Sequence, residues 1–197
     1  MQQIRRGQAI YLQGSPARNV YILKKGVVKI NRLTSRGKEI ILDIIREGSI
    51  FGEMALAEPD EMNESAEAIE DGLLCAIKLE DFERVIQKMP TLSMRVTREI
   101  GFRRHRVENK LVDLLFRTVE QRFAKTLLSL VDDFGIPHAD GFLLKIRLTH
   151  KDYAALIAST RETVTATVNS LKSKGLIGID GKYLVIRSLD GVRAIAG

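Results

Sequence analysis

A stretch of about 26 residues, from about Leu92 to Arg117, predicts one long helix, because it follows Pro90 and contains a single glycine and no further proline. A helix of that length extends about 39 Å, which is more than a small domain needs to cover its own core. It carries one apolar stripe with spacings of four, seven, four and three residues, formed by Val96, Ile100, Val107, Leu111 and Leu114. We expect this stripe to mediate dimerisation through the same helix of a second copy of the chain; packing on the helix's own domain alone is the alternative.

The residues before this helix form short apolar runs separated by glycine-containing turns. The runs lie at 20–23, 27–33, 38–45 and 73–79. In the third run, Ile40, Leu42 and Ile44 share one face at a period of two, as in a strand. Short strands at this spacing are typical of a β-sandwich or barrel. A short amphipathic helix is predicted at 80–88, before Pro90 ends it.

The residues after the long helix predict a different architecture. A helix at 120–131 and a polar loop at 132–141 precede two neighbouring helices at 149–157 and 160–173. Two capping boxes support the starts of these two helices, Thr149 with Asp152 and Ser159 with Glu162. Asp180-Gly181 then predicts a hairpin over 176–186. Two helices followed by a hairpin describe a winged helix-turn-helix, so the fold class is predicted to be α+β.

The excess positive charge of the chain lies in its second half. The formal net charge of +6 divides into −1 for residues 1–90, +4 for 91–118 and +3 for 119–197. A basic half joined to a near-neutral half favours one part that senses and one that binds a polyanion; a merely soluble basic surface is the alternative. No apolar run reaches the roughly 18 residues of a membrane-spanning helix. With no visible signal peptide and Cys75 as the only cysteine, we expect a cytoplasmic protein without an intrachain disulfide or an iron–sulfur cluster.

The outward face of the second short helix carries the residues that we expect to contact DNA: Thr160, Arg161, Glu162, Thr163, Thr165 and Asn169. Arg161 can donate two hydrogen bonds to guanine, and Glu162 can accept one from the amino group of cytosine. Thr160 and Thr163 are placed to reach phosphates at the helix N-terminus. For Glu162, a purely structural role in the capping box is the alternative.

The order of these parts resembles the cyclic-AMP receptor protein / fumarate–nitrate reductase regulator (CRP/FNR) family over nearly the whole chain. The matching segments are Gly52-Glu53-Met-Ala-Leu56, residues 114–128 and Ser159-Thr-Arg-Glu-Thr-Val164. The resemblance implies a jelly-roll, cyclic-nucleotide-binding-like β-sandwich at 1–90, a dimerisation helix at 91–118 and a winged helix-turn-helix at 119–197. It also implies a homodimeric transcription regulator that binds double-stranded DNA with pseudo-palindromic half-sites related to TGTGA, with RNA polymerase as a partner.

Two positions depart from the family pattern. Ala166 stands where members that respond to cyclic AMP carry a second base-reading arginine. We expect the absence of that arginine contact to relax discrimination at one base pair by roughly 1–3 kcal/mol. Ala158 stands at the bend of the helix-turn-helix, where glycine is usual. A residue other than glycine there must tolerate an unfavourable φ or shift the turn.

The sensory half lacks the residue that relatives use to bind a cyclic phosphate. In those relatives the cassette that begins with Gly-Glu ends in Arg-Ser, and the arginine pairs with the phosphate. Here Glu64 takes the place of that arginine, or Asn63 if no residue is inserted. Additional carboxylates lie nearby in the sequence, at Glu58, Asp60, Glu61 and Glu67. A cyclic phosphate would be repelled, so we expect no response to cyclic AMP.

The identity of the effector stays open. By resemblance, the effector pocket is expected to include Gly52, Glu53, Glu64, Ser65, Arg103 and Val107. A Glu53–Arg103 pair would hold the sandwich against the long helix without a ligand; a solvated Arg103 is the equal alternative.

A haem- or small-molecule-dependent gas or redox sensor of the same architecture is the second candidate function. Cys75, or less readily His105, would then offer an axial ligand for haem, although the apolar surroundings of Cys75 favour a buried core thiol. No metal site is expected, because the histidines lack the spacing of metal ligands. No nucleophile elbow, P-loop or H-E-x-x-H motif is present, so we do not expect an enzyme.

Overall fold

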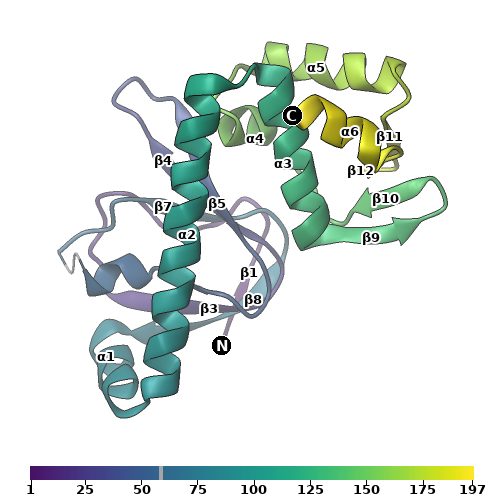
Figure 1. The fold of residues 1–197 in the computed structure, drawn as a ribbon. Coiled ribbons are helices and arrows are strands. Elements are labelled where there is room, and N and C mark those ends of the chain that lie inside the picture. Colours follow the sequence, from purple (N-terminus) through teal and green to yellow (C-terminus); the bar gives the residue numbers. More distant parts are fainter. Residues whose placement is uncertain (58–59) are drawn as a thin grey trace. The chain divides into compact units, whose positions relative to one another are not determined.

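The computed structural model describes residues 1–57 and 60–197, which divide into two compact units, Met1–Glu108 and Asn109–Gly197 (Figure 1). The first unit contains two four-stranded antiparallel sheets. One has the order β1 (Gln2–Ile4), β8 (Gly72–Lys78), β3 (Asn19–Lys25) and β6 (Ile50–Phe51). The other has the order β2 (Ala9–Tyr11), β7 (Ser65–Ala68), β4 (Val28–Leu33) and β5 (Glu39–Ile45). Leu23 and Leu74 of the first sheet meet Ile30 and Ile45 of the second in one buried core, so the predicted β-sandwich is confirmed.

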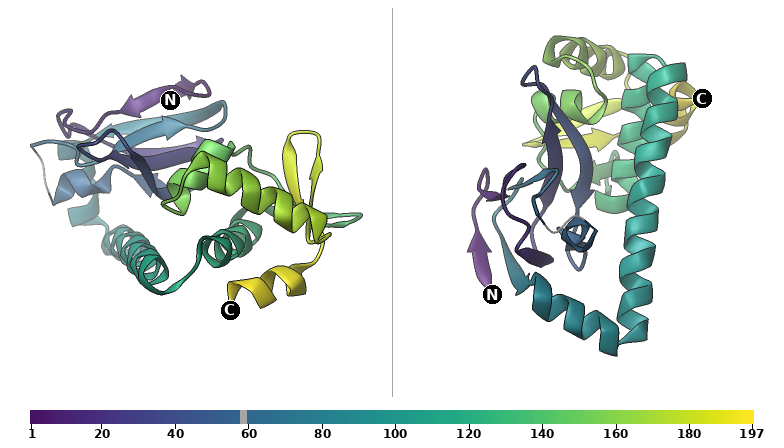
Figure 2. Two further views of the ribbon diagram at one scale, coloured as in Figure 1. Left: turned by 90° about the horizontal axis from the view of Figure 1, so that it is seen from above. Right: turned by 90° about the vertical axis from the view of Figure 1, so that its left-hand side faces the viewer.

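Helical segments complete the first unit. A 3₁₀ helix η1 (Glu53–Leu56) follows β6, and α1 (Leu79–Lys88) confirms the short helix predicted before Pro90. The long helix α2 (Pro90–Phe116) meets α1 at a sharp bend (Figure 2). Val96 of α2 is only 4% exposed and packs with Val20, Ile50 and Phe82. The N-terminal part of α2 therefore belongs to the core of its own unit.

The alternation in β5 buries different residues from those that the apolar pattern suggests. The buried positions are Ile41, Asp43 and Ile45, whereas Ile40 is exposed. Asp43 faces inward because it accepts hydrogen bonds from arginine side chains of α2, which compensate the burial of its charge.

The second unit confirms the winged helix-turn-helix. After the end of α2, it contains α3 (Val119–Phe134), β9 (Gly135–His138), β10 (Gly141–Leu144), α4 (His150–Leu156), α5 (Arg161–Ser173), β11 (Ile177–Asp180), β12 (Tyr183–Ile186) and α6 (Leu189–Ala196). The ring of Phe123 in α3 meets Tyr153 in α4 edge to face, with centroids 5.4 Å apart. Val164, Val168 and Leu171 of α5 are buried in the same unit.

The predicted polar loop at 132–141 is wrong. Residues 132–134 continue α3, and β9 and β10 form a hairpin that adds to β12, giving a sheet of order β11-β12-β10-β9. The hairpin is short and contains Pro137, so its own sequence carries little strand signal. Its pairing with β12, which lies far along the chain, supplies the missing stabilisation.

An ion-pair cluster ties the last turns of α2 to α3. Asp113 is 9% exposed and accepts from Arg117 Nε at 2.9 Å and from Lys125 Nζ at 2.7 Å. Thr118, between the helices, caps α3 in a capping box with Gln121. Within the described residues, no helix is long and apolar enough to span a bilayer.

The bend between α4 and α5 contains the strained residue that the sequence predicts. Ala158 has a φ of 49°, in the left-handed region, and Ser159 N donates to Ala154 O at 2.9 Å, as in a Schellman motif. This conformation costs an L-residue roughly 1–2 kcal/mol.

We expect Ala158→Gly to raise the free energy of unfolding by about 0.5–1 kcal/mol, because relief of strain exceeds the added entropy of the unfolded chain. Chemical denaturation followed by circular dichroism measures the change. Ala166→Gly, at an exposed position inside α5, is the control and should lower the stability by about 1 kcal/mol. Destabilisation by both substitutions would contradict the strain at Ala158.

Candidate nucleic-acid interface and effector pocket

The start of α5 is capped by Thr160 and not by Ser159. Thr160 Oγ1 accepts from Thr163 N at 3.2 Å, and the two threonine hydroxyls lie 2.9 Å apart. The predicted capping box of Ser159 with Glu162 is therefore wrong, because the helix begins one residue later than that box requires. The predicted box of Thr149 with Asp152 at α4 is confirmed. Since Glu162 takes no part in the cap, its carboxylate is left for another role.

The exposed face of α5 brings together four of the six expected DNA-contacting residues. Arg161 and Glu162 are exposed in the first turn, Asn169 lies two turns later, and Thr160 is exposed at the cap. Neither the Arg161 nor the Glu162 side chain has a hydrogen-bond partner among the residues that the structure describes. A guanidinium and a carboxylate that are both unpaired on an exposed first turn are available to read base edges.

The remaining two residues of that set are more enclosed. Thr163 and Thr165 are half-buried. The hydroxyl of Thr165 donates to Arg161 O at 2.8 Å and lies 2.8 Å from His150 Nδ1 of α4. Thr165 thus joins the two helices and holds the turn that carries Arg161. Nothing in the sequence pattern marked His150 for this contact.

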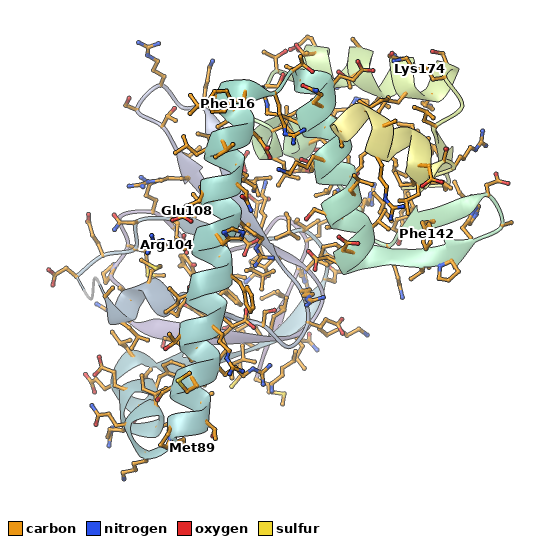
Figure 3. The ribbon with its side chains drawn as sticks, in the orientation of Figure 1. Met89, Arg104, Glu108, Phe116, Phe142 and Lys174 are labelled. Carbon is orange, nitrogen blue, oxygen red and sulfur yellow. The ribbon has the colours of Figure 1, made fainter. Side chains whose placement is uncertain are left out.

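Lys174 lies at the far end of the helix (Figure 3). Its Nζ lies 2.8 Å from Glu120 Oε1 of α3, so its charge is already partly compensated.

In the first unit, Arg103 is buried among acceptors that come from the sandwich. Its guanidinium donates to Glu53 Oε1, to Asp43 Oδ2 at 3.2 Å and to Ile50 O at 3.0 Å. The side chain is 10% exposed, so the Glu53–Arg103 pair is present and the solvated alternative is wrong. Burial acts to lower the pKa of Arg103, but the Glu53 and Asp43 carboxylates outweigh it and raise that pKa.

Glu64 lies in the same interior without a cationic partner within ion-pair distance in the described part of the chain. It is 8% exposed and accepts a hydrogen bond from Tyr11 Oη at 3.2 Å. Burial raises the pKa of Glu64, and the negative charge of Glu53 raises it further. Burial, together with the charge of Glu64, also raises the pKa of the Tyr11 hydroxyl, so Tyr11 stays a donor.

The other residues expected in the effector pocket are arranged differently. Gly52 has a φ of 75°, and a side chain there would approach the Tyr21 ring to 3.1 Å. Ser65 Oγ accepts from Gln13 N at 2.8 Å, so that hydroxyl already has a backbone partner. Val107 is 40% exposed on α2. The polar cluster therefore consists of Glu53, Glu64 and Arg103 with three residues that sequence reasoning missed: the buried Tyr11 and Asp43 and the half-exposed Arg106.

Of these three, Asp43 had a signal in the sequence, a lone carboxylate inside the apolar run Ile40-Ile-Leu-Asp-Ile-Ile45. Arg106 Nη2 also donates to Asp43 Oδ2, at 3.0 Å. Tyr11 had no such signal. Of the acidic residues named beside the cassette, Glu58 lies outside the described residues.

The two candidate axial ligands for haem have ordinary surroundings. Cys75 is half-buried, so the expected fully buried thiol is wrong; its neighbour Leu74 faces the core instead. The His105 side chain is 71% exposed on α2. No group of three or more His, Cys, Asp or Glu residues in ranges 1–57 and 60–197 could hold a metal ion.

The apolar stripe expected on α2 is exposed along most of its length. Ile100 is 36% exposed, Val107 40%, Leu111 58% and Leu114 44%. Val96 does not share this exposure, because it is buried in the core of its own unit. Beside the stripe, Arg104 and Glu108 form an exposed pair at 2.7 Å (Figure 3).

Comparisons with known proteins agree with both units. Residues 1–89 match the cyclic nucleotide-binding domain, and residues 121–195 match the Crp-like helix-turn-helix domain. A global nitrogen regulator of Nostoc sp. is 34% identical over 92% of this chain and 82% of its own length. The CRP-like cAMP-activated global transcriptional regulator of Mycobacterium tuberculosis is 30% identical over 92% of this chain and 81% of its own.

A solved CRP-family transcriptional regulator of Thermus thermophilus superposes with a TM-score of 0.82 at 27% identity, over 100% of this chain and 97% of that one. These relatives are transcription regulators and not enzymes. The chain therefore belongs to the CRP/FNR family of transcription regulators.

Proposed function

We propose that this regulator acts as a homodimer that reads a pseudo-palindromic DNA site through Arg161 and Glu162, in the cytoplasm and without cyclic AMP. The observation that carries the proposal is the exposed first turn of α5, where both side chains are free of partners among the described residues. Thr160, Thr163 and Asn169 would add backbone and flanking contacts, and Thr165 would position Arg161.

Dimerisation supplies the two reading helices that such a site requires. The exposed residues Ile100, Val107, Leu111 and Leu114 repeat along α2 at coiled-coil spacing, and a second α2 would remove them from water. Two recognition helices related by a two-fold axis lie about 34 Å apart, so half-site centres would lie about 10 bp apart. RNA polymerase is the partner that such a regulator would engage on DNA.

Independence from cyclic AMP follows from the charge of the interior. A cyclic phosphate needs a cationic clamp, but Glu64 is a carboxylate, and the guanidinium of Arg103 is already shared by Glu53 and Asp43. The Mycobacterium relative is named as activated by cAMP, so the two proteins would differ in effector.

We expect Arg161→Ala to weaken binding to a selected DNA site by about 1–3 kcal/mol and to broaden preference at one base position. Gel retardation, followed by selection from a random DNA pool, measures both effects. Lys172→Ala removes an equal charge from the exposed last turn of α5 and should leave base preference unchanged. If Arg161→Ala weakened binding to every sequence by one factor, Arg161 would be a phosphate contact.

Leu111→Glu should convert the dimer to a single subunit and reduce DNA affinity, because the carboxylate would be buried in an apolar interface. Sedimentation equilibrium gives the mass. Leu12→Glu is a matched control, since Leu12 is also 58% exposed but lies outside α2. A wild-type mass of one subunit, also with DNA present, would refute the proposed dimer.

Calorimetry of the wild-type protein with cyclic AMP should show no binding at micromolar concentrations, with the Mycobacterium relative as the positive control. Micromolar binding would refute independence from this ligand.

A further inference from the structure

We propose that the acidic interior of the sandwich, formed by Tyr11, Glu53 and Glu64, binds an organic cation that carries N–H donors, either a primary amine or a guanidinium group. Binding of this cation does not depend on DNA recognition. A role of the cation as an effector rests on the proposed function.

The first support is an imbalance of charge. Three buried carboxylates, Asp43, Glu53 and Glu64, are 4%, 2% and 8% exposed. Arg103 forms ion pairs with Asp43 and Glu53, and the half-exposed Arg106 forms a second ion pair with Asp43. Among the described residues, Glu64 receives only the hydrogen bond of the Tyr11 hydroxyl, and the charge of Arg103 acts on it from beyond ion-pair distance. A buried carboxylate is stable when a cation and further donors compensate its lost hydration.

The second support is an acceptor without a donor. Glu53 Oε1 is bound by Arg103, but Glu53 Oε2 is buried and has no hydrogen-bond partner among the described residues. Such an atom loses its hydration without compensation. The charge of Glu53 also acts on Glu64 and on Tyr11, so the free oxygen belongs to the same cluster.

The third support is the aromatic wall beside these carboxylates. Tyr11, Tyr21 and Phe51 stack with ring centroids 5.1–6.3 Å apart. Gly52, directly before Glu53, turns against the Tyr21 ring. Aromatic faces and carboxylates both attract cations. The rings stack on one another in the core, so the carboxylates are the groups that select a positively charged ligand and repel carboxylates and phosphates.

The overall charge of the protein makes this selection informative. The formal net charge of +6 comes from residues 91–197, whereas residues 1–90, which contain the sandwich, carry only −1 and so attract cations weakly. A cation that binds must therefore gain its affinity from a local site and not from general attraction.

Isothermal titration of the full-length protein with agmatine, which carries an amine and a guanidinium, tests the proposal. We expect saturable binding with one site per chain. Tetramethylammonium at equal ionic strength has charge but no N–H donor, and should bind at least tenfold more weakly. Glu64→Gln should weaken agmatine binding at least tenfold, whereas Glu61→Gln, at an exposed position of the same segment, should not.

A second measurement uses the wild-type protein, so its result does not depend on whether the variants fold. In the wild-type protein, the carboxyl carbon resonance of Glu64 should shift when agmatine is added, and the resonance of Glu61 should not. Absence of agmatine binding, or equal binding by Glu64→Gln, would overturn the proposal. Thermal stability that responds to acid but not to agmatine would also overturn it, because a proton would then occupy the site.

DNA retardation separates the two proposals. A protein that binds DNA but not agmatine contradicts only this inference, and one that binds agmatine but no DNA contradicts only the proposed function.

Discussion

The buried guanidinium of Arg103 fixes α2 against the sandwich. It meets Glu53 in η1, Asp43 in β5 and the backbone of β6, so three separate segments converge on one side chain. Removing one partner of a buried ion pair typically costs about 3–5 kcal/mol, because the other charges are left uncompensated. The apolar contact of Val96 with Phe82 and Ile50 adds a second attachment on the same helix.

This attachment determines which face of α2 stays free. Val96 and Arg103 face the sandwich, and Ile100, Val107 and Leu111 remain exposed. In the middle of α2 an arginine turns inward while several apolar side chains meet water, which is unusual for an isolated domain. This arrangement is explained when the exposed apolar residues form an interface and the inward arginine is neutralised by carboxylates.

Much of the architecture could be predicted from sequence, because glycine turns, helix-breaking prolines and capping residues are local signals. The Asp180-Gly181 hairpin and the strain at Ala158 both follow from such signals. The β9–β10 hairpin could not be predicted in this way, since it depends on pairing with the distant β12. The start of α5 was misplaced by one residue because Ser159 and Thr160 are equally good caps in isolation.

The polar interior was only partly predictable for a related reason. Glu53 and Arg103 could be paired by resemblance, but burial of Asp43 runs against the apolar pattern of β5. Tyr11 lies in a strand of only three residues, which is too short for periodicity to be informative. Buried polar contacts join residues that are distant in sequence, so the composition of one segment does not reveal them.

The cluster around Asp113 has a mechanical consequence. Because Asp113 binds both Arg117 and Lys125, the final turns of α2 and the beginning of α3 form a stiff elbow. The connection at Thr118 is also locked by its capping box, so it is a poor place for a pivot. The compact units divide earlier, between Glu108 and Asn109. The end of α2 and the whole of α3 would therefore move as one piece within the second unit.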